Sequence, residues 1–315
     1  MNQGYKNVST QKEILEIFSG ISNKYDLMND VMSFGLHRLW KRKFASMILD
    51  VVLKKKIEKM ILHESFHVDS EVEKDDSLRL EDALKDIVGE DSQADNDAFC
   101  RSLDNTNKAE NDVNSDDSEW QKKRKYIYLI DTASGTCDIP IYLTDMSRKM
   151  GIEECDMKII ASEPNREMKT IGKDKSIDAN CLQVNVVGDD ATKLNFSDEC
   201  FDIYTISFGI RNIVDKDKAL SEAYRVLVHG GEFFCMEFAQ PNFALKPFYN
   251  VYNKIIPKLG KLIANNSSAY KYLVDSIEMF PAPIDFCKMI RKAGFKNVGF
   301  TNISRMVNIY RGTKK

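Results

Sequence analysis

The chain has 315 residues, of which 43% are hydrophobic, and a formal net charge of −3. This length supports a globular protein with a substantial core, and the sequence has no run of about 18 apolar residues, which excludes a membrane-spanning helix. The seven cysteines are scattered without a C-x-x-C pair. Their pattern favours reduced thiols in an intracellular compartment over a disulfide framework or a zinc site.

The charge is unevenly distributed along the chain. Residues 63–122 hold 19 acidic and 6 basic side chains, a local charge of −13, so the remaining 29 acids and 39 bases give the rest of the chain +10. A basic body favours an anionic partner such as phospholipid headgroups. Nucleic acid is not expected as a partner, because no basic–aromatic recognition motif accompanies the charge.

Residues 11–62 show helical periodicity. The first part presents an apolar face formed by Ile14, Leu15, Ile17, Phe18 and Ile21. We expect a polar break at 23–30 and a second amphipathic helix at 44–62. Two interpretations are open: the helices pack on the protein with a solvated basic face, or they form a lid over an active site, with aromatic and methionine side chains near a hinge at Gly35.

Residues 63–122 are rich in Asp, Glu, Ser and Asn, and their few apolar residues cannot bury a core. We therefore expect a disordered acidic insertion. At its start, His63-Glu64-Ser65-Phe66-His67 matches the H-E-x-x-H pattern of zinc peptidases. Because a zinc site needs a rigid helix, a third ligand and a cleft, we expect no metal here.

From Tyr126 onward, short strands alternate with helices, which predicts a doubly wound α/β fold. The expected strands are 126–130, 158–161, 184–187, 201–206, 232–237, 298–302 and 306–310. The expected helices are 139–150, 217–227, a partly aromatic segment at 243–280, and 285–293. His229-Gly230-Gly231 is expected to stop the helix that precedes the fifth strand.

Ligands of such a sheet bind outside the carboxyl ends of its strands. The first strand leads through Asp131 into a small-residue turn at 133–137, which is either part of a ligand site or a plain strand-to-helix connection. Glu163 follows the second strand, where it is either a solvated acid or an acceptor for both ribose hydroxyls of an adenosine group. Asp190 and Ala191 follow the third strand and suit an adenine ring. No phosphate-binding glycine motif is present, so S-adenosylmethionine, which has adenosine but no phosphate, fits.

Three longer segments are distinctive. They are KYDLMNDVMSFG at 24–35 with RLW at 38–40, TISFGIRN at 205–212, and YKYLVDSI at 270–277 with FP at 280–281. In these segments and their order, the chain resembles the ubiquinone/menaquinone biosynthesis C-methyltransferases, the UbiE/COQ5 family. The resemblance covers about residues 12–62 and 123–303.

The resemblance implies a class I S-adenosylmethionine-dependent methyltransferase. It implies one Rossmann-like domain over 1–315, with a seven-stranded sheet, helices on both faces and an N-terminal helical lid. The implied cofactor contacts are Thr136, Glu163, Asp190, Ala191 and Ser207. The first turn departs from the family pattern, which is closer to G-G-T-G where this chain has S-G-T-C at 134–137. A cofactor-binding but catalytically impaired scaffold of a quinone-synthesis complex is therefore an alternative.

The implied reaction is C-methylation of 2-methoxy-6-polyprenyl-1,4-benzoquinol to its 5-methyl product in ubiquinone biosynthesis. A demethylmenaquinone methyltransferase shares this chemistry and is the other alternative. The ring carbon attacks a methyl group well only when the quinol is a phenolate. Arg211 is the candidate to stabilise that phenolate or to orient a water that takes the proton, with Asn212 positioning the ring.

The implied setting is a membrane surface, because the polyprenyl tail of the substrate is membrane-soluble. The resemblance implies a peripheral protein on the matrix side of the inner mitochondrial membrane, with other quinone-biosynthesis proteins as partners and a homodimer as a further option. Candidates for a tail channel are Tyr25, Met28, Met32, Phe34, Trp40, Phe248, Tyr249 and Tyr252.

Overall fold

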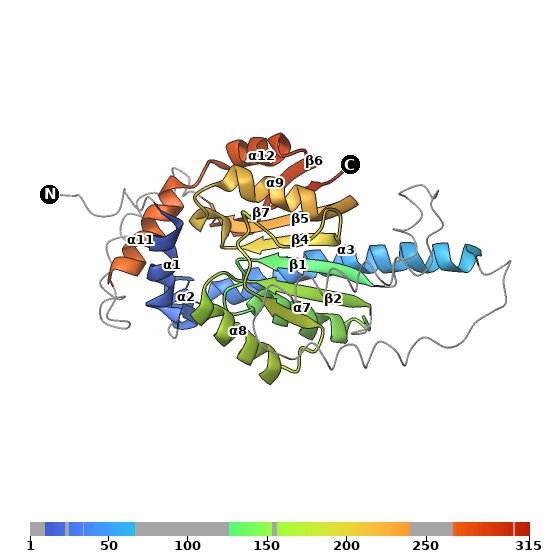
Figure 1. The fold of residues 1–315 in the computed structure, drawn as a ribbon, viewed down its shortest axis with the longest axis horizontal. Helices are drawn as coiled ribbons and strands as arrows, with labels where there is room; N and C mark the ends of the chain where they lie inside the picture. The colour runs from blue at the N-terminus through green and yellow to red at the C-terminus, as the bar shows by residue number, and fades with distance from the viewer. Residues whose placement is uncertain are drawn as a thin grey trace.

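The computed structural model of the chain describes residues 10–22, 25–33, 35–66, 126–152, 156–239, 267–304 and 306–315 (Figure 1). Nearly all of the expected acidic insertion lies outside the described residues. Residues 243–266 of the expected aromatic helical segment also lie outside them.

A seven-stranded sheet forms the centre of the protein, in the order β3-β2-β1-β4-β5-β7-β6. Strands β1 to β5 run parallel, and β7 pairs antiparallel with both β5 and β6. The strands are β1 Ile127–Thr132, β2 Met157–Ser162, β3 Val184–Val187, β4 Phe201–Ser207, β5 Leu227–Phe238, β6 Lys296–Asn302 and β7 Val307–Thr313. The strand order reverses between β1 and β4, and such a switch point is where open α/β sheets bind ligands. The predicted doubly wound fold is confirmed.

Helices cover both faces of the sheet (Figure 1). Helices α3 and α7 pack on one face, and α9 and α12 pack on the other. Helices α1, α2 and α11 lie beyond the carboxyl ends of the parallel strands (Figure 1). The helices are α1 Gln11–Ser19, α2 Tyr25–Ser33, α3 Leu36–Phe66, α7 Asp138–Lys149, α8 Arg166–Asp178, α9 Lys216–Val226, α11 Ser267–Met279 and α12 Pro283–Lys292.

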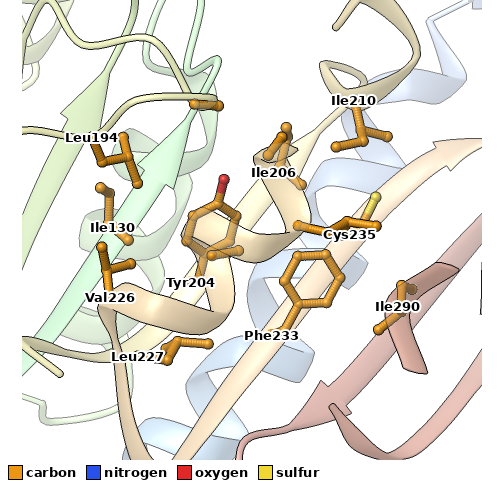
Figure 2. Close-up of a cluster of buried hydrophobic side chains, with 14 of the residues drawn as sticks. Ile130, Leu194, Tyr204, Ile206, Ile210, Val226, Leu227, Phe233, Cys235 and Ile290 are labelled. Atoms are coloured by element: carbon orange, nitrogen blue, oxygen red, sulfur yellow. The ribbon is translucent and has the colours of Figure 1, made fainter. Parts of the chain in front are cut away.

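Side chains alternate along each strand between two apolar layers, because successive residues of a strand point to opposite faces. Ile127 joins the layer under α3 and α7, whereas Tyr128 joins the layer under α9 and α12. Figure 2 shows the second layer, in which the rings of Tyr204 and Phe233 stack with their centroids 5.6 Å apart. Burial on both faces explains why the central strands read as continuous apolar runs.

The expected polar break at 23–30 is wrong, because most of it lies in helix α2. Asp30 of this helix has tertiary contacts with two side chains of α3. Asp30 Oδ1 lies 2.9 Å from His37 Nε2, and Asp30 Oδ2 accepts a hydrogen bond of 2.7 Å from Arg38 Nη2. These contacts tie α2 to the first turn of α3.

The expected stop at Gly230 and Gly231 is also wrong. Strand β5 begins at Leu227, directly after α9, and contains both glycines. The register of β5 on β4 is irregular between Phe201 and Ile203, and Gly230 has a left-handed φ of 74° there. The glycines therefore lie in an irregular part of the strand instead of in a turn before it.

Candidate functional site

A cavity that is partly open to solvent lies at the carboxyl ends of β1, β2 and β3. Helix α1 forms one wall, and the loops after β1, β2, β3 and β4 form the others. The polar lining residues are Gln11, Glu163, Asn165, Asp190 and Asn212. Of the expected site residues, Glu163, Asp190 and Ala191 line the cavity, and Thr136, Ser207 and Arg211 do not.

Glu163 is a buried acid at the cavity wall, with only 7% of its surface exposed. Its Oε2 accepts a hydrogen bond of 2.8 Å from the backbone N–H of Gly135, and its Oε1 accepts one of 2.9 Å from that of Asn165. Burial nevertheless raises the pKa of Glu163 to about 7. Each carboxylate oxygen keeps an acceptor site, so the oriented group can take two hydroxyl donors, as a ribose diol requires.

The end of β3 supplies a polar and a small residue. Asp190 Oδ1 accepts hydrogen bonds from the backbone N–H and the Oγ1 hydroxyl of Thr192, both at 2.7 Å, which fixes the carboxylate. Ala191 is buried in the cavity wall, where its short side chain leaves room for a flat ring. Ser207 ends β4, and its buried hydroxyl has no hydrogen-bond partner among the described residues.

Asp131 of β1 precedes the first turn and is fixed by Thr205 of β4, whose Oγ1 donates a hydrogen bond of 2.6 Å to its carboxylate. Burial raises the pKa of Asp131 to about 6. Thr136 Oγ1 donates to Asp26 Oδ1 of α2 at 3.2 Å and accepts from Lys175 Nζ of α8 at 3.2 Å. The turn reaches the cavity through Ala133 and Gly135, and a direct contact from Thr136 to a cofactor stays a prediction.

The loop after β4 comes very close to the first turn. A Cβ atom on Gly209 would lie 2.6 Å from Cβ of Ala133, a distance that real Cβ contacts do not show. Both residues line the cavity. Glycine at this point of the TISFGIRN segment therefore lets the two loops form a single wall.

Arg211 lies in a short 3₁₀ helix, Ile210–Asn212, directly after this loop. Its Nη1 donates to Glu237 Oε1 at 2.8 Å and to the Phe208 carbonyl at 2.5 Å. The Glu237 side chain is fully buried, and the guanidinium lies 5.3 Å from the ring centroid of Phe238. Arg211 Nε is buried without an acceptor among the described residues. The guanidinium is thus held by Glu237 and the Phe208 carbonyl, while its buried Nε–H has no acceptor among the described residues.

Comparison with known proteins identifies the family of this site. Residues 6–61 and 106–314 match the model of the ubiE/COQ5 methyltransferase family. The chain belongs to this family. It is 35% identical over 309 residues to the ubiquinone/menaquinone biosynthesis C-methyltransferase UbiE of Rickettsia prowazekii (strain Madrid E), which covers 96% of this chain and 94% of the relative. The UbiE protein of Rickettsia akari (strain Hartford) is 34% identical over 318 residues, 99% of this chain and 97% of the relative.

Among solved structures, a SAM-dependent methyltransferase from Aquifex aeolicus matches with a TM-score of 0.44 at 14% identity, over 60% of this chain and 82% of that chain. Membership of the ubiE/COQ5 family makes the chain a methyltransferase with the class I fold. It also confirms S-adenosylmethionine as the expected cofactor. The cavity residues fit this molecule, because Glu163 offers acceptors for a diol beside the small side chain of Ala191.

In this ubiE/COQ5 member, Cys137 stands where the family has a glycine, and its side chain is packed away from the cavity. Cys137 takes a left-handed φ of 60°, and its side chain is fully buried and does not line the cavity. A Cβ atom on Gly172 of α8 would lie only 2.7 Å from Cys137 Sγ, so α8 has a glycine where the thiol needs room. Burial also raises the pKa of Cys137 to about 12, which keeps the thiol neutral at pH 7.

One part of the N-terminal segment agrees with the lid interpretation, and another part agrees with the interpretation of helices packed on the protein. Helix α1 and Tyr25 of α2 line the cavity, as the lid interpretation expects. Trp40 of α3 is 4% exposed and packs against Phe208 and Phe238, as the packing interpretation expects. The other candidates for a tail channel have side chains outside the described part of the protein.

Asn165 and the helix that follows it were missed by the sequence analysis. Asn165 caps α8 by accepting a hydrogen bond of 3.0 Å from the backbone N–H of Met168. Its Nδ2 donates to Leu15 O at 3.0 Å and to Ser19 Oγ at 2.9 Å, which fastens α1 over the cavity. An Asn directly before a charged helical segment is an N-cap signal that could have revealed α8.

Metal and membrane features can be judged only for the described residues. Within them, no three His, Cys, Asp or Glu side chains are grouped to hold a metal ion. None of their helices combines the length and apolarity needed to cross a bilayer. The H-E-x-x-H motif lies outside the described side chains.

Proposed function

We propose that this chain methylates a ring carbon of a polyprenyl benzoquinol, converting 2-methoxy-6-polyprenyl-1,4-benzoquinol to its 5-methyl product in ubiquinone biosynthesis. The observation that carries the proposal is the buried Glu163 in a cavity at the switch point of the sheet, near the fixed guanidinium of Arg211. The relatives named as ubiquinone/menaquinone biosynthesis C-methyltransferases support the quinone substrate.

The cavity residues hold the adenosine part of the cofactor. Glu163 accepts hydrogen bonds from the ribose hydroxyls, and the backbone N–H groups of Gly135 and Asn165 keep its carboxylate in place. Asp190 binds the exocyclic amine of the adenine, and Ala191 packs against the ring. Ser207 supplies a hydroxyl that has no partner among the described residues. When bound, S-adenosylmethionine supplies an electrophilic methyl group.

Arg211 acts on the quinol. The ring carbon becomes nucleophilic when the neighbouring hydroxyl gives its proton to a water molecule that Arg211 orients, and the guanidinium beside the oxygen stabilises the resulting phenolate. The ion pair with Glu237 fixes the guanidinium, which saves the free energy of orienting it during the reaction. Asn212 lines the cavity and accepts a hydrogen bond of 3.2 Å from Tyr272, so its amide is held to position the ring.

The working place of the enzyme is a membrane surface on the matrix side of the inner mitochondrial membrane, where it meets a lipid-soluble substrate. The charge of about +10 outside residues 63–122 supports binding to an anionic leaflet. Binding to vesicles that contain anionic lipid should fall as salt is added. Equal binding to neutral and anionic vesicles would contradict this part of the proposal.

Two assays test the proposed function. Calorimetry with S-adenosylhomocysteine tests whether the cavity binds the cofactor, and absence of binding at millimolar ligand would refute both the proposed function and the cofactor-binding scaffold. Mass spectrometry of the product made from a short-tailed demethyl benzoquinol, beside a demethylnaphthoquinol of equal tail length, tests the ring. We expect methylation of the benzoquinol carbon, and turnover of the naphthoquinol alone would establish the menaquinone reaction instead. Binding without methyl transfer to either quinol would leave the scaffold alternative.

A further inference from the structure

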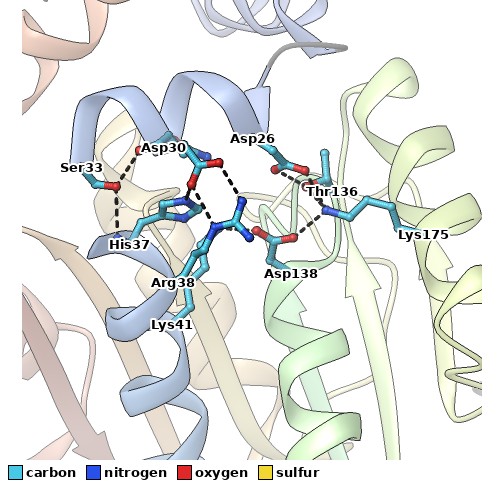
Figure 3. A network of polar contacts seen from close by, with 10 residues as sticks. Asp26, Asp30, Ser33, His37, Arg38, Lys41, Thr136, Asp138 and Lys175 are labelled. Carbon is cyan, nitrogen blue, oxygen red and sulfur yellow. Dashed lines mark hydrogen bonds and ion pairs between the residues drawn. The ribbon is translucent and has the colours of Figure 1, made fainter. Parts of the chain in front are cut away.

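A network of charged side chains joins α2 to the first turn beside the cavity (Figure 3). Lys175 Nζ of α8 lies at its centre, 2.9 Å from Asp26 Oδ2, 2.7 Å from Asp138 Oδ1 and 3.2 Å from Thr136 Oγ1. Lys41 Nζ of α3 lies 2.6 Å from Asp138 Oδ2. The network thus connects the N-terminal helices with both helices that flank the first turn, and two cations balance two anions.

Burial divides the network into an inner and an outer part. The side chains of Lys41 and Asp138 are 8% and 20% exposed, whereas those of Lys175 and Asp26 are 31% and 42% exposed. Although burial opposes its ionisation, Lys41 and Lys175 lower the pKa of Asp138 to about 2. Asp138 therefore stays ionised within the inner pair, and the outer pair is the part that water and salt can reach.

Asp26 links the outer pair to the cavity wall. Asp26 follows Tyr25, whose side chain lines the cavity, so holding Asp26 holds that wall. Separation of Asp26 from Lys175 would leave Lys175 still paired with Asp138, while Asp26 would move into solvent. An unpaired charge in the interior would be costly. Opening of α2 at this end avoids that cost, because it leaves no unpaired charge buried.

We propose that Asp26 and Lys175 are positioning residues that hold α2 and Tyr25 closed over the bound cofactor and separate when it exchanges. The inference rests on the proposed function, because it takes the cavity as the cofactor site. Thr136 belongs to this mechanism, since its hydroxyl contacts both residues of the outer pair. The cofactor exchange rate is then set by an ion pair outside the cavity.

The test is the dissociation rate and Kd of S-adenosylhomocysteine, measured with the full chain at about 0.05 M and about 0.5 M salt. The variant is Asp26→Asn, which keeps the shape and removes the charge. Asp30→Asn is the matched control, because it removes an acid of the same helix whose partners, His37 and Arg38, lie on α3. Asp26→Glu restores the charge.

We expect Asp26→Asn to dissociate about tenfold faster than the wild type at low salt, as loss of a charge-assisted hydrogen bond implies. Salt should accelerate dissociation from the wild type and Asp30→Asn, but not from Asp26→Asn, and Asp26→Glu should regain the salt response. Equal rates for the wild type and Asp26→Asn would overturn the inference, and so would equal acceleration by Asp30→Asn. A wild type that binds no S-adenosylhomocysteine would instead refute the proposed function.

Discussion

The ionisation of Glu163 gives the sharpest prediction, because its carboxylate is both the proposed ribose acceptor and a group with a raised pKa. Its pKa of about 7 lies within the working range of pH, and burial is the main cause. A protonated acid offers one acceptor fewer and cannot bind both ribose hydroxyls equally well. Cofactor affinity should therefore fall as the pH falls through 7.

The expected size follows from the fraction of carboxylate in the empty cavity. With a pKa of about 7, roughly 90% of Glu163 side chains are ionised at pH 8 and roughly 10% at pH 6. If only the carboxylate binds, the Kd for S-adenosylhomocysteine should rise about tenfold between these values. In the variant Glu163→Gln, binding should be weaker and this dependence on pH should disappear.

The raised pKa of Glu163 affects the stability of the cofactor-free protein in the opposite direction: cofactor affinity falls as the pH falls, whereas the free energy of unfolding rises. A folded-state pKa raised from 4.5 to about 7 stabilises the fold fully below pH 4.5, and the contribution is lost as the pH rises through 7. Its size is roughly 3 kcal/mol. Calorimetric Kd values and thermal unfolding from pH 5.5 to 8, for the wild type and Glu163→Gln, test both effects. A wild-type Kd that does not change with pH, or an unchanged slope in the variant, would refute the reasoning.

Two further predictions concern buried neighbours of the cavity. Gly172→Ala should lower the free energy of unfolding by about 1–3 kcal/mol, because its methyl group would meet Cys137 Sγ at 2.7 Å, and Cys137→Gly in the same chain should restore part of the loss. Additive effects of the two substitutions in urea unfolding would show that the residues are not coupled. Glu237→Gln should cost about 3–5 kcal/mol by leaving Arg211 charged and unpaired, whereas Arg211→Met with Glu237→Gln should cost less. If the double variant is the less stable of the two, the ion-pair argument fails.

The fold was largely predictable because its strands are continuous apolar runs that end at small or polar residues. Strand β3 was predicted with its observed bounds, 184–187, and the expected 126–130 differs from β1 by one residue at its start and two at its end. Helix α2 was not predictable, since the propensity of a polar segment says little when its acids have partners in the folded chain. Asp30 is an example, because it contacts two side chains at the start of α3.

The site was predictable at the strand ends and less so in its contacts. Glu163 directly follows β2 and Asp190 lies three residues after β3, so both line the cavity at the carboxyl ends of parallel strands. The partners of the other residues are distant in sequence: Thr136 contacts Asp26, 110 positions away, and Arg211 pairs with Glu237, 26 positions away. No local pattern encodes such pairs.

The central claim is that Arg211, which directly precedes the cavity residue Asn212, promotes methyl transfer to a quinol carbon. The most direct measurement is transfer of labelled methyl from S-adenosylmethionine to a demethyl benzoquinol by the wild type, Glu237→Gln, and Arg211→Met with Glu237→Gln. The double variant removes the buried charges together, so its cofactor binding can be compared on a folded protein. We predict that it binds S-adenosylhomocysteine like the wild type and transfers methyl at least about 100-fold more slowly. Wild-type turnover by a double variant with intact cofactor binding would contradict the claim.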